Sequence, residues 1–285
     1  MRCSKCRTAL YCGRACQEKH WPVHKNTCID SNNTDDSDEK LDTKAFNHLN
    51  QGSYINIKGS SSSSSLIHNR LGKYAKAEKL YNKLLNRLRQ KLGDSNRSTL
   101  SAMHMLAVAV ANQGKYLDAE ALLKQCLDKR KVVLGENDPD TLASMSNYAE
   151  NHNQQEKYLE AETLLKQCLA KQKVILGESH SDTLDTMHKL VTAYSKQGFH
   201  SEAEILCKHC LDISTSVLGE DDPKTLITMN SLAAVYHIQG KYREAELIYR
   251  QCFDKQLAVL GFGHPETMST MQSLLVVQVS LTQES

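Results

Sequence analysis

The sequence predicts an all-α protein, an α-solenoid of stacked helix pairs behind a small metal-binding segment. The first observation is a period of 42 residues, which places the same short words in register along most of the chain. The second is that five of the ten cysteines lie within the first 28 residues. Units that recur at this period bury their apolar faces only against their neighbours, which is typical of a solenoid. The columns that define the period are Gly72, Gly114, Glu156, Gly198 and Gly240, and Gly93, Gly135, Gly177, Gly219 and Gly261.

The composition of the 285 residues favours an intracellular protein that binds other proteins. The formal net charge is +2 and charges are mixed along the repeats, so charge gives no reason to expect a nucleic acid or a membrane as partner. No apolar run approaches the roughly 18 residues of a membrane-spanning helix, and no signal peptide is readable. Clustered cysteines indicate metal in a reducing compartment, so we expect a cytoplasmic and/or nuclear location.

The first 28 residues form a candidate metal site. Thiolate sulfur and imidazole nitrogen are the ligands that zinc prefers, and so short a segment has too little apolar material to fold without a crosslink. No glutamate lies in a metalloprotease-type context, so a structural zinc is favoured over a catalytic one. The candidate ligands are Cys3, Cys6, Cys12, Cys16, His24 and Cys28.

The words Tyr11-Cys12, Cys16-Gln17, His20-Trp21 and His24-Lys25 resemble the MYND-type zinc finger. The resemblance implies two interleaved zinc sites and a role in binding proteins, commonly proline-containing peptides. It assigns one complete site to Cys3, Cys6, His24 and Cys28. Cys12 and Cys16 match half of the second site, whose other cysteine pair would lie upstream of Met1. We therefore expect one tightly bound Zn2+ per chain.

Three explanations of the half-ligated second site stay open. The chain is an N-terminally truncated product, which we favour; or a single zinc suffices; or His20 and water complete a second site. Spacing alone is also compatible with one zinc held by Cys3, Cys6, Cys12 and Cys16.

Residues 29–65 are predicted to be a flexible linker. An acidic stretch is followed by Asn, Gly and a run of six serines from Ser60 to Ser65. Such a composition buries too little apolar surface to order itself.

Residues 66–281 are predicted to be the repeat array, in which each unit is a pair of helices. In one copy, apolar spacings predict helix A over about 140–155 and helix B over about 158–176. A Gly-Lys-Tyr turn joins the two helices, and a Leu-Gly pair ends helix B. A column of methionines (103, 145, 187, 229 and 271) is expected to be a buried knob on helix A. The expected inward face of helix B consists of Ala161, Leu164, Leu165, Cys168, Leu169 and Ile175.

This period predicts four complete helix pairs over about 96–259. A lone helix B at 73–91 precedes them and a lone helix A at about 265–281 follows them. The words from Leu232 to Glu246 resemble the tetratricopeptide repeat, and the 42-residue version resembles the repeats of kinesin light chains. The resemblance implies a solenoid whose groove binds extended peptides. The N-terminal heptad coiled coil of kinesin light chains is replaced here, so a motor subunit is not inferred.

The predicted groove is lined by helix A positions four and seven residues apart. These side chains are polar and nearly uncharged, suited to hydrogen bonding a peptide backbone. An equally weighted interpretation is that they are ordinary solvated residues on an unused surface. The candidates are His104, Ser146, Asn147, Glu150, Asn153, His188, Thr192, Asn230 and His237. Val108, Ser195, Ala234, Gln272 and Val276 share their columns, and the column adjacent to these holds Asn147 and Lys189.

The cysteines of the repeats are predicted to fill the core. Cys126, Cys168, Cys210 and Cys252 share one helix B column, and Cys207 occupies a column that is otherwise apolar.

The sequence as a whole favours a non-catalytic adaptor that holds partner proteins through a groove and a zinc finger. No phosphate-binding loop or nucleophile motif is readable, so we expect no enzyme activity. The alternative is an accessory subunit of an enzyme or transcription-regulating complex, whose basic finger contacts nucleic acid.

Overall fold

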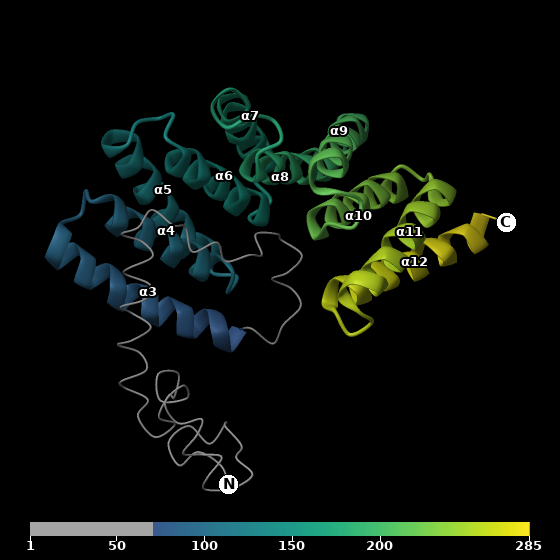
Figure 1. Ribbon diagram of the computed structural model, residues 1–285, viewed down its shortest axis with the longest axis horizontal. Coiled ribbons are helices and arrows are strands. Elements are labelled where there is room, and N and C mark those ends of the chain that lie inside the picture. The colour runs from purple at the N-terminus through teal and green to yellow at the C-terminus, as the bar shows by residue number, and fades with distance from the viewer. Residues whose placement is uncertain (1–70, 285) are drawn as a thin grey trace, which may run out of the picture. The chain divides into compact units, whose positions relative to one another are not determined.

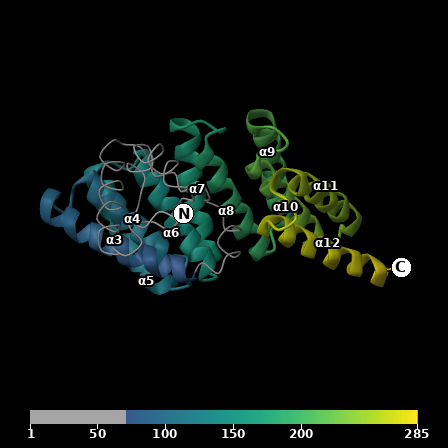
Figure 2. The ribbon, with the colours of Figure 1, turned by 60° about the horizontal axis from the view of Figure 1, so that its bottom comes forward.

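The computed structural model describes residues 71–284, in which ten helices and no strand are formed. The predictions made for residues 1–28 and for the linker at 29–65 lie outside the described residues. Figures 1 and 2 show the helices following one another in order from α3 to α12.

The helices alternate between two types, as the period predicts. Helices of type A are α4 (Arg97–Ala111), α6 (Pro139–Gln154), α8 (Ser181–Gln197), α10 (Pro223–Ile238) and α12 (Pro265–Glu284). Helices of type B are α3 (Leu71–Leu92), α5 (Tyr116–Val133), α7 (Tyr158–Ile175), α9 (His200–Leu218) and α11 (Tyr242–Leu260). The four complete pairs are thus confirmed, with a B-type helix before them and an A-type helix after them in the described chain. The boundaries of α6 and α7 agree with the predicted ones to within one residue.

Local chemistry sets where the A-type helices begin. The side chains of Asp138 and Asp222 accept hydrogen bonds from the backbone N–H two residues on, and a proline follows each at the first helical position. At the opposite end of the unit, Gly135 has φ 92°, a left-handed conformation that a Cβ would strain. The Leu-Gly word therefore ends each B-type helix for a steric reason.

Each helix packs against the helix that follows it, and several A-type helices also contact each other. In the described chain α4 packs against α6, α6 against α8, and α10 against α12, and a hydrogen bond joins α8 to α10. The A-type helices thus form one layer and the B-type helices the other. We call the surface on which successive A-type helices adjoin the A face.

Small and apolar columns fill the space between the layers. The B-type column Ala119, Ala161, Ala203 and Ala245 is fully buried, as is the A-type pair Leu100 and Leu142. Fully buried alanines allow close approach of helices, so these columns hold the repeat spacing.

Two predictions about the core need correction. Met103, Met145 and Met187 are buried, but Met229 and Met271 are only half-buried. Met271 lies on α12, which no further described pair covers, and Met229 lies on α10, which packs against α12.

The second correction is Ile175, which is 40% exposed. It is the last residue of α7 and lies beyond Gln172, which takes the final buried position of that helix.

A recurrent contact between units explains why Gln, Lys and Glu return in most of them, although Phe199 takes the place of the lysine in one. The amide of Gln155 and the ammonium of Lys157 both donate to Glu120 Oε2, at 2.9 and 3.0 Å, across neighbouring units. The same contacts join Gln113 and Lys115 to Glu78. One carboxylate per B-type helix is thus held by the turn of the next unit.

Candidate partner-binding surface

The predicted groove residues lie on consecutive A-type helices, and most of them bond to the neighbouring A-type helix. His104 lies on α4; Ser146, Asn147, Glu150 and Asn153 lie on α6; His188 and Thr192 lie on α8; and Asn230 and His237 lie on α10. The structure therefore brings the set together as a polar seam along the A face, which neither sequence interpretation described.

Between α4 and α6 the seam is centred on His104. Its Nε2 lies 3.0 Å from Asn147 Nδ2 and its Nδ1 lies 3.2 Å from Ser144 Oγ. The Asn147 amide must donate, because its oxygen is already an acceptor, so Nε2 carries no proton and Nδ1 carries one. Burial, with the charges of Arg130 and Lys189, holds the pKa of His104 well below its usual 6.5. This histidine is a neutral structural link.

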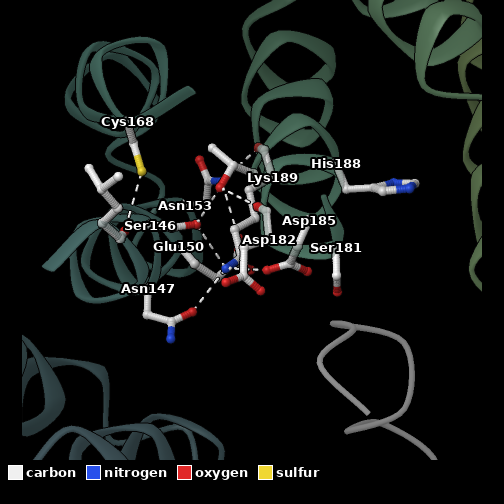
Figure 3. Close-up of polar contacts among 12 residues, drawn as sticks. Ser146, Asn147, Glu150, Asn153, Cys168, Ser181, Asp182, Asp185, His188 and Lys189 are labelled. Atoms are coloured by element: carbon white, nitrogen blue, oxygen red, sulfur yellow. Dashed lines mark hydrogen bonds and ion pairs between the residues drawn. The ribbon is translucent and has the colours of Figure 1, made fainter. Parts of the chain in front are cut away.

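Between α6 and α8 the seam is centred on Lys189 (Figure 3). Its ammonium donates to Ser146 Oγ at 3.1 Å and to Asn147 Oδ1 at 2.9 Å, both on α6. It also pairs with Asp185, one turn earlier on α8, at 2.7 Å. The Lys189 side chain is only 12% exposed. An ammonium group has three N–H donors, and three acceptors fill them here.

Towards the C-terminus the links are isolated hydrogen bonds, including one that the Lys224 ammonium on α10 donates to Ser181 Oγ on α8. His188 Nε2 lies 2.8 Å from Thr228 Oγ1 on α10, and burial lowers the pKa of this histidine. Thr270 Oγ1 on α12 donates to Asn230 Oδ1 at 3.4 Å. The seam therefore continues across the described units, but the ion pair and multiple hydrogen bonds of Lys189 give way to fewer contacts.

Glu150 and Thr192 bond only within their own helices, and Asn153 makes one link, from Nδ2 to the Lys189 carbonyl on α8. Glu150 is half-buried, and desolvation raises the pKa of its carboxyl group. Asn153 is 5% exposed, and its Oδ1 has no hydrogen-bond donor. Thr192 is exposed and bonds only to the His188 carbonyl of its own helix. These three side chains therefore take a smaller part in the contacts between repeats than His104 or Lys189 does.

The role of Asp185 was not predicted. The sequence pattern that indicates it is the Asp185–Lys189 pair at i, i+4, together with the polar residues Ser146 and Asn147, which lie 43 and 42 residues before the lysine. Lys189 appeared only as a neighbour of the groove columns, whereas it is the group that joins α6 to α8.

The repeat thiols are core residues, as predicted. Cys126, Cys168, Cys207, Cys210 and Cys252 are free and buried. Burial raises the pKa of Cys168 and of Cys210 to about 11, and that of Cys252 to about 12. Cys207-Lys-His-Cys210 is thus no exposed redox pair, since a thiol rather than a thiolate is present at neutral pH.

Two further features of residues 71–284 concern metal ions and membranes. No group of three His, Cys, Asp or Glu side chains there could hold a metal ion. None of the described helices combines the length and the apolar character needed to cross a bilayer.

Comparison with known proteins identifies both parts of the chain. Four overlapping segments, 62–131, 106–173, 140–206 and 182–258, match the tetratricopeptide repeat model, and residues 1–28 match the MYND finger model. The MYND finger implies zinc binding, and its Cys and His donor set fits that ion.

Curated relatives match the finger alone. The histone-lysine N-methyltransferase SMYD3 of Homo sapiens is 61% identical over 28 residues, which span 10% of this chain and 6% of that enzyme. The Mus musculus enzyme is 57% identical over the same share of each chain.

Solved structures match the array. A Podosopora anserina protein named as a kinesin light chain with nearly identical TPR-like repeats has a TM-score of 0.57 and 24% identity, covering 77% of this chain and 94% of that chain. BtubC (BKLC) from P. vanneervenii has a TM-score of 0.59 and 18% identity, covering 80% and 94%. At these identities the likeness shows the fold alone. The repeat model covers more than half of the sequence, so the chain belongs to the tetratricopeptide repeat family.

Proposed function

We propose that this chain is a non-catalytic adaptor, which binds one partner on the A face of the repeats and another through the MYND finger. The observation that carries the proposal is the occurrence, in one chain, of two interaction modules. In the described module, Glu150 and Thr192 bond only within their own helices, and Asn153 keeps one acceptor without a donor. Polar acceptors with few internal partners suit the backbone and side chains of an extended peptide.

The finger contributes a small metal-stabilised surface in this proposal. Zinc would be held by Cys3, Cys6, His24 and Cys28, which close a tetrahedral sphere and leave no position for a substrate. Cys12 and Cys16 would form half of a second site. The expected partner is a short peptide, in line with the family resemblance.

The linker at 29–65 would join the two modules. Its polar composition favours a flexible tether, which raises the effective concentration of one partner near the other without fixing their geometry. The two binding events would then assist each other when the partners are themselves linked.

A second candidate is contact between the finger and nucleic acid within a larger regulatory complex. It is favoured by the basic residues Arg2, Lys5, Arg7, Arg14, Lys19 and Lys25. Such binding would weaken steeply with added salt, because each phosphate contact releases counterions. Peptide binding on the nearly neutral A face would depend far less on salt.

The adaptor proposal is tested by blocking each surface in the full-length, zinc-loaded chain. Thr192→Arg places a bulky side chain on the A face. Thr163→Arg is the matched control, since Thr163 is also exposed and bonds only to the carbonyl four residues earlier, on α7. Cys3→Ser removes a predicted zinc ligand.

Captured partners are compared by quantitative mass spectrometry. We expect Thr192→Arg and Cys3→Ser to remove different partners, and Thr163→Arg to remove none. Identical partner sets for all four proteins would reject the proposal.

A further inference from the structure

We propose that the A face between α6 and α8 is a receptor for a basic side chain, lysine or arginine, of an extended partner peptide, with Glu150 and Asn153 as its acceptors. This inference rests on the proposed function, because it assumes that the A face binds peptides. It specifies that the bound peptide carries a positive charge, and that Glu150 and Asn153 bind the charged side chain.

The only ammonium group of the α6–α8 seam is already occupied. Lys189 pairs with Asp185 at 2.7 Å and gives its other donors to Ser146 and Asn147. To bind a carboxylate of a partner, Lys189 would have to break contacts that are largely screened from water. An acidic peptide therefore finds no ready cation here.

Glu150, by contrast, has no cation in contact with its carboxyl group. Its Oε1 accepts from Gln154 Nε2 at 2.7 Å and its Oε2 accepts from Asn153 Nδ2 at 3.4 Å, and both donors are neutral amides. Lys189 acts on it only through the longer-range field. Asp185 and Glu150 are thus two acidic groups beside one ammonium group, and a second cation placed against Glu150 would favour its ionised form.

Asn153 supplies the second acceptor. Its Nδ2 donates to the Lys189 carbonyl at 3.0 Å, which fixes the orientation of the amide, since the reversed amide would oppose two oxygens. The Oδ1 atom is then left without a donor in a residue that is only 5% exposed. An unsatisfied buried acceptor of this kind is costly, so a donor from outside the chain would stabilise it.

The two acceptors lie side by side, because Asn153 Nδ2 bonds to Glu150 itself. Figure 3 shows both side chains projecting from α6 towards α8. A group with several N–H donors and a positive charge meets both demands at once, and lysine and arginine carry such groups. A metal ion does not fit, since residues 71–284 provide no group of three ligating side chains.

The test begins with a selection against the full-length, zinc-loaded chain. The probe is a displayed library of nine-residue peptides with blocked ends and all residues except cysteine randomised. Peptides are kept when Thr192→Arg lowers their binding and Thr163→Arg does not. We expect the kept peptides to share lysine or arginine at one fixed position.

A double-mutant cycle then locates the acceptor. Replacing the shared basic residue by norleucine should weaken binding to the wild-type chain by about 10- to 100-fold, as expected for a hydrogen bond to a charged group. The same replacement should change binding to Glu150→Gln by less than about 3-fold, because the charge that reads it is gone. Glu160→Gln is the matched control: it removes one exposed carboxylate from α7 and should behave as the wild type.

Glu150→Asp keeps the charge and should retain a preference for the basic peptide, which guards against a folding defect in Glu150→Gln. Kept peptides without a shared basic residue, or a norleucine penalty unchanged in Glu150→Gln, would overturn the inference while the adaptor function stands. If Thr192→Arg weakened no selected peptide, the peptide-binding A face and this inference would both be rejected.

Discussion

The Lys189 ammonium lies 2.7 Å from the Asp185 carboxylate on α8, and it also donates hydrogen bonds to Ser146 and Asn147 of α6. Lys189 joins two repeats through these contacts. In the proposed use of the A face, a basic side chain of a partner therefore pairs with Glu150.

Lys189→Met should destabilise the array. The change leaves Asp185 without its cation, and Ser146 and Asn147 without their donor. Breaking a fully buried pair costs about 3–5 kcal/mol, so we expect about 2–3 kcal/mol for this largely buried one, measured by urea unfolding. Lys166→Met breaks another i, i+4 pair, with Glu162, whose lysine is 54% exposed, and should cost well under about 1 kcal/mol. Equal losses for the two variants would contradict the central role of Lys189.

Glu204 should make the array sensitive to acid. Hydrogen bonds from Lys208 and then Lys241 lower its pKa from 4.5 to about 2. A folded-state pKa below the unfolded one means that the stabilisation is complete above about pH 4.5 and is lost as pH falls through about 2.

Glu204→Gln should therefore lower stability by about 1 kcal/mol at pH 7 and show a smaller loss between pH 4.5 and 2 than the wild type. Urea midpoints at pH 7 and pH 2 measure this, with the exposed Glu202→Gln as control. An identical pH dependence in wild type and Glu204→Gln would refute the assignment.

The repeat thiols should resist alkylation in the native chain. The five array cysteines are buried, and burial raises the pKa of each thiol, so both access and thiolate are lacking. We expect iodoacetamide at pH 8 to modify them only after unfolding, as read by peptide mass spectrometry. Rapid native labelling of Cys207 or Cys210 would argue against their place in the core.

Glu156→Gly should raise stability. Glu156 has φ 63° in the column where other units carry glycine, and it is the non-glycine residue with positive φ in the described chain. Relief of this conformation, less the entropy that glycine gains in the unfolded chain, should yield about 0.5–1 kcal/mol. Glu156→Ala removes the side chain but keeps the Cβ, so it should give no gain in melting temperature. A gain with alanine would assign the effect to charge instead.

Zinc content should distinguish the two ligand sets. We expect one zinc per chain by metal analysis, lost in Cys3→Ser and retained in Cys12→Ser. The alternative set of Cys3, Cys6, Cys12 and Cys16 requires both variants to lose the metal. Structural zinc contributes on the order of 10 kcal/mol to the folding of such segments. We therefore expect each variant either to bind one zinc per chain or to bind none, rather than a fraction of a zinc. Two zincs or none in the wild type would contradict the single-site assignment.

The sequence by itself determined where the helices begin and end, because each repeat contains the residues that start and stop its helices. Asp138 and Pro139 begin α6, and Gly135 follows the end of α5. The fully buried alanine column sets the distance between the two layers of helices. These are local steric and capping effects, which a sequence displays directly. The burial of the repeat cysteines followed in the same way from their shared column.

The tertiary structure alone decided which polar residues remain available. His104, Ser146 and Asn147 read as groove residues in the sequence, yet they bond to helices 40 to 43 residues away. Glu150, in contrast, bonds only to neutral amides of its own helix, and Asn153 keeps an Oδ1 acceptor that no described residue fills. Spacing fixes the face on which a side chain lies, but hydrogen-bond partners depend on distances between separate helices, and those exist only once the repeats have stacked.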